Sequence, residues 1–192
     1  IIIDEVYWGF MGFGDAHSER QWSKNEKSIL KTAATNFGGK FKSERNEKAF
    51  RSIVEGTSSR VGDEFFHSLV RHLALALDVR YVFVSEYSGF GNQCRVLAGW
   101  NGEKYLSSIQ FNPENTPCEE ILAGMVSFCS YSPQEMFVGD HFLANRKIRS
   151  YAGAPFFDSS SKVIGHLAVM DDKPMVDRQR TLSILRIFAA RA

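Results

Sequence analysis

SYAGAPFFDSSSKVIGHLAVMD, residues 150–171, is the stretch that decides the fold. It contains two mainly apolar runs, 150–157 and 163–170, which are separated by the polar run 158–162. Apolar runs of this length on either side of a cluster of turn-forming residues are typical of two β-strands joined by a turn. We therefore predict strands at 150–157 and 163–170.

Three more strands are predicted upstream, at 80–87, 95–100 and 105–111. Asn101-Gly102 separates the last two and is a dipeptide that favours a tight hairpin, and residues 88–92 form another turn. Successive strands with such short connections favour an antiparallel sheet over βαβ winding.

Helices are predicted on both sides of these strands. Residues 62–78 and 177–192 have apolar residues at helical spacing. The segment between the two groups of strands predicts short helices at 116–123, 133–137 and 140–147, around an apolar segment at 126–131. Pro117 suits the first turn of its helix.

The N-terminal residues 1–21 predict a fragment of a sheet. Ile1–Ile3 and Tyr7–Phe13 are expected to form strands joined by a turn at Asp4-Glu5, followed by a polar loop. Because a lone hairpin is marginally stable in water, these strands need additional partners.

A long helix is predicted from about Lys24, because Ser23 to Glu26 form a capping-box pattern. Gly38-Gly39 leaves two alternatives open, a close contact or a break in the helix. Residues 40–51 are highly charged with a narrow apolar stripe, which is typical of a solvent-bridging helix or a coiled coil. A break is expected at 56–59.

The second part of the chain resembles the GAF domain, a small α/β sensory fold. The resemblance is carried by four segments, which are Gly62–Phe66, Asn115–Glu119, Ser150–Pro155 and Val163–Asp171. The last two are similar to the family's paired strands, "y-x-G-x-P" followed by "G-x-L-x-v". The resemblance implies an α/β (α+β) fold with an antiparallel sheet flanked by helices, and a complete domain at 57–192.

The N-terminal part repeats some of this pattern. Trp8–Asp15, followed by Trp22-Ser23 and a helix, mirrors Ile164–Asp171, followed by Asp177 and a helix. The repeat implies that residues 1–40 end an upstream GAF-like domain and that 41–56 form a helical linker. Similar tandem arrays occur in the input regions of bacterial sensor histidine kinases and diguanylate cyclases, where the connecting helix is often a parallel dimer. We therefore expect a homodimer through the linker helix.

Composition excludes several classes of function. The 23 basic and 22 acidic residues show no excess that would indicate a nucleic-acid partner. No apolar run approaches the ~20 residues that span a bilayer, and Ile1–Ile3 are followed by acidic residues, unlike a secretory leader. Three widely spaced cysteines indicate a reducing, cytoplasmic setting. Since the first residue is not methionine, we expect a piece of a longer protein.

A ligand pocket is predicted between the sheet and the crossover 116–149. Its candidate walls are aromatic, with the alternative that these side chains only fill the core: Trp100, Tyr105, Phe111, Phe128, Phe137, Phe142 and Tyr151. Glu119, Asn145 and Arg149 are the candidate polar groups. Cys118 lies at a predicted helix start, where the helix dipole lowers a thiol pKa, so it is a candidate for a redox or ligand role beside the simpler interpretation of a buried apolar residue.

No metal, catalytic or cofactor site is predicted. His166 is interpreted as a histidine of the sheet, and Asp171-Asp172 as a turn at the end of a strand without a raised carboxyl pKa. Within the resemblance, Asn145-Arg146-Lys147-Ile148 lacks the signature of cyclic-nucleotide binders. No cysteine is followed by histidine, as in bilin binders, and the motif around the cysteines does not match free methionine sulfoxide reductases.

The functional prediction is a non-catalytic regulatory module that binds a small molecule or dimerises, and relays through the linker helix to a kinase or cyclase domain elsewhere, as in two-component systems. Two alternatives are a dimerisation module without a ligand and a thiol-based reductase.

Overall fold

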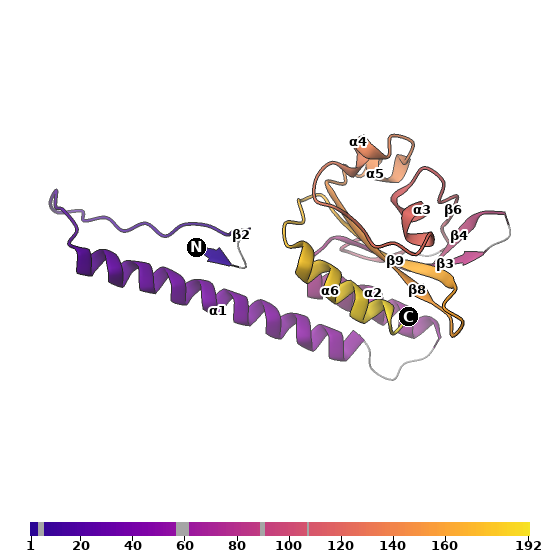
Figure 1. Cartoon of the computed structure of the whole chain (residues 1–192), viewed down its shortest axis with the longest axis horizontal. Coiled ribbons are helices and arrows are strands. Elements are labelled where there is room, and N and C mark those ends of the chain that lie inside the picture. The colour runs from indigo at the N-terminus through magenta and orange to yellow at the C-terminus, as the bar shows by residue number, and fades with distance from the viewer. Residues whose placement is uncertain (4–5, 57–61, 89–90, 107) are drawn as a thin grey trace. The chain divides into compact units, whose positions relative to one another are not determined.

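The computed structural model describes residues 1–3, 6–56, 62–88, 91–106 and 108–192 (Figure 1). The chain divides into two units, Ile1–Lys48 and Ala49–Ala192. The predicted turn at Asp4-Glu5, most of the predicted break at 56–59 and part of the predicted turn at 88–92 lie outside the described residues. Among the helices described, none combines the length and apolarity needed to cross a membrane.

The first unit contains a short hairpin and most of one helix. Strands β1 (Ile2–Ile3) and β2 (Val6–Tyr7) pair antiparallel. The second strand was expected to reach Phe13 but ends at Tyr7, because β1 offers only two residues to pair with. The chain from Trp8 to Trp22 forms no helix or strand.

Helix α1 (Lys24–Gly56) begins as predicted. The Ser23 amide donates to Glu26 Oε2 over 2.8 Å, and the Glu26 amide donates to Ser23 Oγ over 3.3 Å, which is the reciprocal capping box. The helix continues through Gly38-Gly39 without a break. A Cβ atom at Gly38 would lie 3.1 Å from Ile1 Cγ2, so the structure favours close contact with the N-terminal residues as the role of this glycine.

The second unit is built on a seven-stranded sheet of described residues. Its strands are β3 (Tyr81–Ser88), β4 (Gln93–Trp100), β5 (Tyr105–Leu106), β6 (Gln110–Phe111), β7 (Ser127–Cys129), β8 (Ser150–Phe157) and β9 (Val163–Asp171). Their order is β5-β4-β3-β9-β8-β7, with β6 also on β4, and every pairing is antiparallel. The predicted fold class is confirmed.

Two long helices cover one face of this sheet, α2 (Asp63–Leu77) and α6 (Arg178–Ala189), as Figure 1 shows. They bury a dense apolar cluster whose fully buried members include Leu69, Leu73, Val82, Val84, Leu185 and Phe188. The other face carries three short helices, α3 (Pro117–Leu122), α4 (Pro133–Met136) and α5 (His141–Asn145). A second cluster lies there, with Ile121, Leu143, Ile148 and Tyr151 among its buried members.

Two glycines within residues 150–171 lie where other parts of the domain approach the backbone too closely for a side chain. A Cβ atom at Gly153 would lie 2.2 Å from Ile121 Cδ1, so only glycine lets α3 pack this closely on β8. A Cβ atom at Gly165 would lie 2.2 Å from the Ser85 carbonyl oxygen. Both positions therefore need a residue without a side chain where strands and helix approach one another.

The third predicted strand, 105–111, is interrupted. It appears as β5 and β6, with Ser108 between them at a φ of 62°. The hairpin before it is closed by the Trp100–Tyr105 pair, so its loop has four residues. Asn101 Oδ1 accepts from the amides of Glu103 and Lys104 at 3.0 and 2.8 Å, which explains why asparagine starts this loop.

Candidate ligand pocket

A cavity of about 320 Å³ lies between the sheet and the short helices of the second unit. This volume is near the lower end of the range for small-molecule sites. The sheet contributes Phe83, Ser85, Val96, Phe111, Tyr151, His166, Ala168 and Met170. The rest of the lining is Ile109, Asn112, Glu114, Thr116, Cys118, Gly139, Asp140, His141 and Phe142.

Strand pairing places the polar residues of the cavity floor. Ser85 on β3 lies opposite His166 on β9, and in an antiparallel pair opposite residues share a face. The pairing of β3 with β4 shifts between Val84 and Ser85, so Ser85 pairs with Val96, which also lines the cavity. This bulge keeps Ser85 and Val96 together on the pocket side.

Ser85 and His166 are both buried, and each has a polar atom without a hydrogen bond in the described part of the chain. Each of the two residues is 1% exposed. Ser85 Oγ and His166 Nδ1 have no hydrogen-bond partner among the described residues. Burial lowers the pKa of His166 to about 4, so the imidazole is neutral at pH 7. The cavity therefore presents a hydroxyl and a neutral imidazole side by side.

A second polar pair lies between α3 and β8. Cys118 Sγ is 3.6 Å from the Tyr151 hydroxyl, and either group can be the donor. Cys118 lies two residues after the N-cap residue Thr116, whose Oγ1 accepts from the Cys118 amide over 3.2 Å. The expected lowering of the thiol pKa is wrong, because burial raises the pKa of Cys118 to about 11. Burial likewise raises the Tyr151 pKa well above its usual value.

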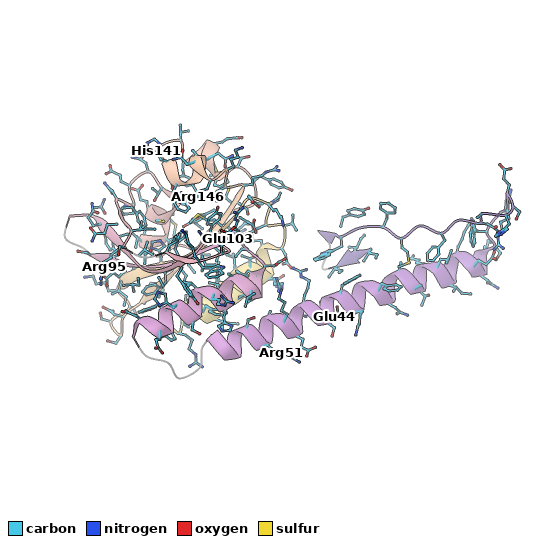
Figure 2. The ribbon with its side chains drawn as sticks, turned by 180° about the vertical axis from the view of Figure 1, so that it is seen from behind. Glu44, Arg51, Arg95, Glu103, His141 and Arg146 are labelled. Atoms are coloured by element: carbon cyan, nitrogen blue, oxygen red, sulfur yellow. The ribbon has the colours of Figure 1, made fainter. Side chains whose placement is uncertain are left out.

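Apart from two histidines, His141 and His166, the charge-bearing residues of the lining are acidic. Glu114 and Asp140 contribute carboxylates, whereas the described lining residues include no lysine or arginine. Asp140 caps α5, since its Oδ1 accepts from the amides of Phe142 and Leu143 at 2.9 and 3.1 Å. The guanidinium of Arg146 lies 4.1 Å from the Phe142 ring centroid but does not line the cavity. Figure 2 shows His141 and Arg146 together on the side of the domain where α5 lies.

The structure brings four of the candidate residues together on the cavity wall, namely Phe111, Cys118, Phe142 and Tyr151. Trp100, Tyr105 and Phe128 lie elsewhere, contrary to the expectation. Trp100 pairs with Val82 and packs with the α2–α6 cluster, where the Arg71 guanidinium lies 5.0 Å from its ring centroid. 

The Tyr105 ring meets Trp100 edge to face and His67 of α2 at a tilt, with ring centroids 5.1 and 4.8 Å apart. Phe128 pairs with Ala152 and packs against the same α2–α6 cluster.

The remaining candidates also lie outside the lining. Phe137 packs against the second cluster. Glu119, Asn145 and Arg149 are exposed, and Glu119 Oε2 accepts from the Asn115 amide over 2.9 Å. These three polar residues of the crossover therefore face solvent or stabilise a turn, whereas the two unpartnered polar atoms of the cavity, Ser85 Oγ and His166 Nδ1, come from the sheet.

Ser85, His166 and Asp140 line the cavity but were absent from the predicted site. His166 was correctly placed in the sheet. The available signal was alternation, since His166, Ala168 and Met170 are two residues apart along β9 and share the cavity face. Sequence alone does not say which face of a strand carries a cavity.

The acidic pair at the end of β9 corrects another expectation. Burial raises the pKa of Asp171 to about 6, and the hydrogen bond and negative charge of Asp172 add to this effect. The pKa of Asp172 is lowered by its hydrogen bond with Asp171 and by Arg80, whose Nη1 lies 3.1 Å from Asp172 Oδ2. The pair lies outside the cavity lining. No group of metal-binding side chains occurs in the part of the chain that the structure describes.

Comparison with known proteins gives a family match. The family model of the GAF domain matches residues 62–192. Among curated proteins, the chain is 36% identical over 63 residues to the methanogenesis regulatory histidine kinase FilI of Methanothrix harundinacea (strain 6Ac). This match covers 33% of the chain and 7% of the kinase, so the chain corresponds to a small part of that protein.

Solved structures support the fold. The GAF domain of an Acinetobacter phosphoenolpyruvate-protein phosphotransferase has a TM-score of 0.57 at 16% identity, over 77% of this chain and 89% of that one. The phycoerythrobilin-bound GAF domain of a cyanobacterial phytochrome has a TM-score of 0.59 at 13% identity, over 77% and 90%. The photosensory core module of the Stigmatella aurantiaca phytochrome has a TM-score of 0.60 at 8% identity, over 77% and 35%.

Proposed function

This chain belongs to the GAF domain family, and on that premise we propose that it senses a small molecule in the cavity and relays occupancy through α1. The parent protein would then be a signalling protein, as the kinase relative is. We place the output domain, a histidine kinase or nucleotide cyclase, outside residues 1–192, and we assign these residues no catalytic step of their own.

The observation that carries this proposal is the pair of unpartnered polar groups facing the cavity. A buried polar group left without a hydrogen bond costs about 1–3 kcal/mol of stability. Ser85 and His166 both carry such a group next to about 320 Å³ of space. A domain that served only as a scaffold would gain stability by filling this space with apolar side chains. Retaining both features favours binding over scaffolding.

Relay requires an element with two arrangements that the ligand favours unequally. Helix α1 is the proposed element, since its 33 residues run from the N-terminal unit into the second unit. Ile29, Phe37 and Phe41 on this helix are 67%, 51% and 47% exposed. These apolar side chains support pairing with α1 of a second copy, which makes a homodimer the proposed working state.

Cysteine cross-linking along α1 tests relay. Lys40, Glu44 and Lys48 would each be replaced by cysteine in a Cys129→Ser background, because Cys129 is the least buried thiol. The small molecule identified by mass spectrometry of the native protein should change the fraction cross-linked at these positions. An unchanged fraction in the presence and absence of that molecule contradicts relay.

A dimerisation module without a ligand is the second candidate, favoured by the same exposed side chains of α1. Sedimentation separates the two ideas when it is combined with a search for a co-purifying molecule. A dimer that is lost in the Phe37→Ala/Phe41→Ala variant, with an empty cavity and no binder in a ligand screen, would favour scaffolding.

The thiol-reductase alternative is disfavoured by the cysteines themselves. Burial raises the pKa of Cys94 to about 12 and that of Cys118 to about 11, so both thiols stay protonated near neutral pH. A protonated thiol is a poor nucleophile. Turnover of free methionine sulfoxide by the native chain, lost in Cys118→Ser, would restore this alternative.

A further inference from the structure

The cavity selects its ligand by charge, by hydrogen bonding and by shape. We propose that it takes an uncharged, flat, ring-containing molecule whose edge carries both a hydrogen-bond donor and an acceptor, and that it rejects anions. This inference rests on the proposed function, because it names the class of molecule that the sensory cavity would hold.

Charge is the first step of the argument. Placing an anion in a largely apolar cavity requires a nearby cation or several donors aimed at it. The described lining residues contribute two carboxylates, Glu114 and Asp140, and no lysine or arginine. His166 cannot substitute for a cation at pH 7, because burial lowers its pKa to about 4. A phosphate or carboxylate on the ligand would therefore meet two carboxylates in the described lining, where the one basic side chain besides His166 is the exposed His141.

Hydrogen bonding is the second step. A serine hydroxyl can donate and accept, and a neutral imidazole has one donor nitrogen and one acceptor nitrogen. Ser85 and His166 lie directly opposite each other on β3 and β9, within the ~5 Å that separates Cβ atoms of such a pair. A carboxamide or lactam edge carries one donor and one acceptor next to each other, so one ligand group can bridge both residues.

Shape is the third step. Three phenylalanine rings line the cavity, those of Phe83, Phe111 and Phe142, beside the ring of Tyr151. The Phe83 and Phe142 rings meet edge to face at 5.3 Å, and the Phe111 ring stands edge-on to His166 at 6.3 Å. Aromatic walls favour flat rings as partners. The volume of about 320 Å³ equals that of roughly ten water molecules, which suits one or two fused rings.

A matched pair of compounds tests the charge rule. Indole-3-carboxamide and indole-3-carboxylate have nearly the same shape, but only the second is an anion at pH 7. Each is titrated into the ¹⁵N-labelled 192-residue chain. The carboxamide should shift the backbone signals of Ser85, His166 and their strand neighbours, with an affinity at least tenfold above that of the carboxylate.

Variants test the hydrogen-bonding rule. Ser85→Ala and His166→Phe each remove one of the unpartnered groups and should weaken carboxamide binding about three- to tenfold, the usual value of one hydrogen bond. Ser68→Ala is the matched control, because Ser68 is a buried serine of α2 on the opposite side of the sheet. Its affinity should equal that of the native chain. Should His166→Phe fail to fold, Ser85→Ala alone decides this step.

The outcomes separate the ligand class from the proposed function. Equal or tighter binding of the carboxylate overturns the charge rule and leaves a sensory cavity standing. Undiminished carboxamide binding by Ser85→Ala overturns the assignment of the polar pair. Absence of binding by both compounds at millimolar concentration overturns the ligand class, and a similarly empty result from a broad screen with anions and cations would overturn the sensory cavity too.

Discussion

The two faces of the sheet in the second unit are built from the same strands and differ in almost every other respect. The face under α2 and α6 is close-packed and apolar. The face under α3, α4 and α5 contains a cavity, two unpartnered polar groups and a buried thiol beside a phenol. Neighbouring residues such as Val84 and Ser85 go to different faces. The contrast indicates that one face supplies stability, which allows the other to keep space and unsatisfied groups for binding.

The largest effect should come from truncation on the packed face. Phe188 on α6 is fully buried in the apolar cluster. Phe188→Ala should lower the free energy of unfolding by about 3–5 kcal/mol, because it leaves a cavity among side chains that cannot collapse. Urea unfolding followed by circular dichroism measures it.

Phe111→Ala is the control on the cavity face. Phe111 is only partly buried and already borders open space, so its loss should cost clearly less. Equal costs at the two positions would contradict the division of roles between the faces.

Acid should lower the stability of the domain through protonation of His166, which lies on the cavity face. Its pKa is about 4 in the folded chain and near 6.5 when unfolded, so the unfolded chain binds the proton more tightly between these values. Stability attributable to His166 is therefore present above pH 6.5 and is lost as pH falls toward 4, by up to about 3 kcal/mol. Urea midpoints measured from pH 7 to pH 4 should show this loss, and His166→Phe should remove it.

Asp171 opposes this trend and provides the control. Its pKa is raised to about 6 from 3.8, so its contribution falls as pH rises through that interval. Asp171→Asn should make the acid loss of the native chain steeper. If the two variants have the same pH profile as the native chain, neither group titrates as the structure indicates.

Substitutions at the contact between α3 and β8 test how closely this helix packs on the sheet. Gly153→Ala places a Cβ atom 2.2 Å from Ile121 Cδ1 and should cost about 1–3 kcal/mol through overpacking. Ile121→Val removes that Cδ1 atom, so the double variant should regain part of the loss. Additive costs in a double-mutant cycle would show that the two residues do not meet.

The smallest expected effect has the opposite sign. Ser85→Ala removes a buried hydroxyl without a partner and should stabilise the ligand-free chain by about 1 kcal/mol. Ser150→Ala is the matched control, since this fully buried serine donates its hydroxyl to the Lys173 carbonyl oxygen. It should destabilise by about 1 kcal/mol. Thermal unfolding of the two variants compares them, and a loss of stability in both would indicate that Ser85 is satisfied in the native chain.

The sequence alone determined the helices and the four longest strands of the second unit, the antiparallel character of its sheet and the start of α1, whereas β7 was expected only as an apolar segment. These features depend on local signals, which are apolar periodicity, turn residues and the cap at Ser23. The glycine motif of 150–171 also had a local signature, although its cause, contact of Gly153 with Ile121 and of Gly165 with β3, lies in residues distant along the chain.

Only the tertiary structure decided which side of each strand faces the cavity. A strand offers its residues to two faces in alternation, and an aromatic residue suits either. Trp100 and Phe128 therefore lie under the long helices, whereas Phe111 and Tyr151 line the cavity. The same applies to Ser85 and His166, because their lack of partners arises from distant elements that leave space above them. Local sequence encodes the period of a strand, and packing between distant segments decides which face stays open.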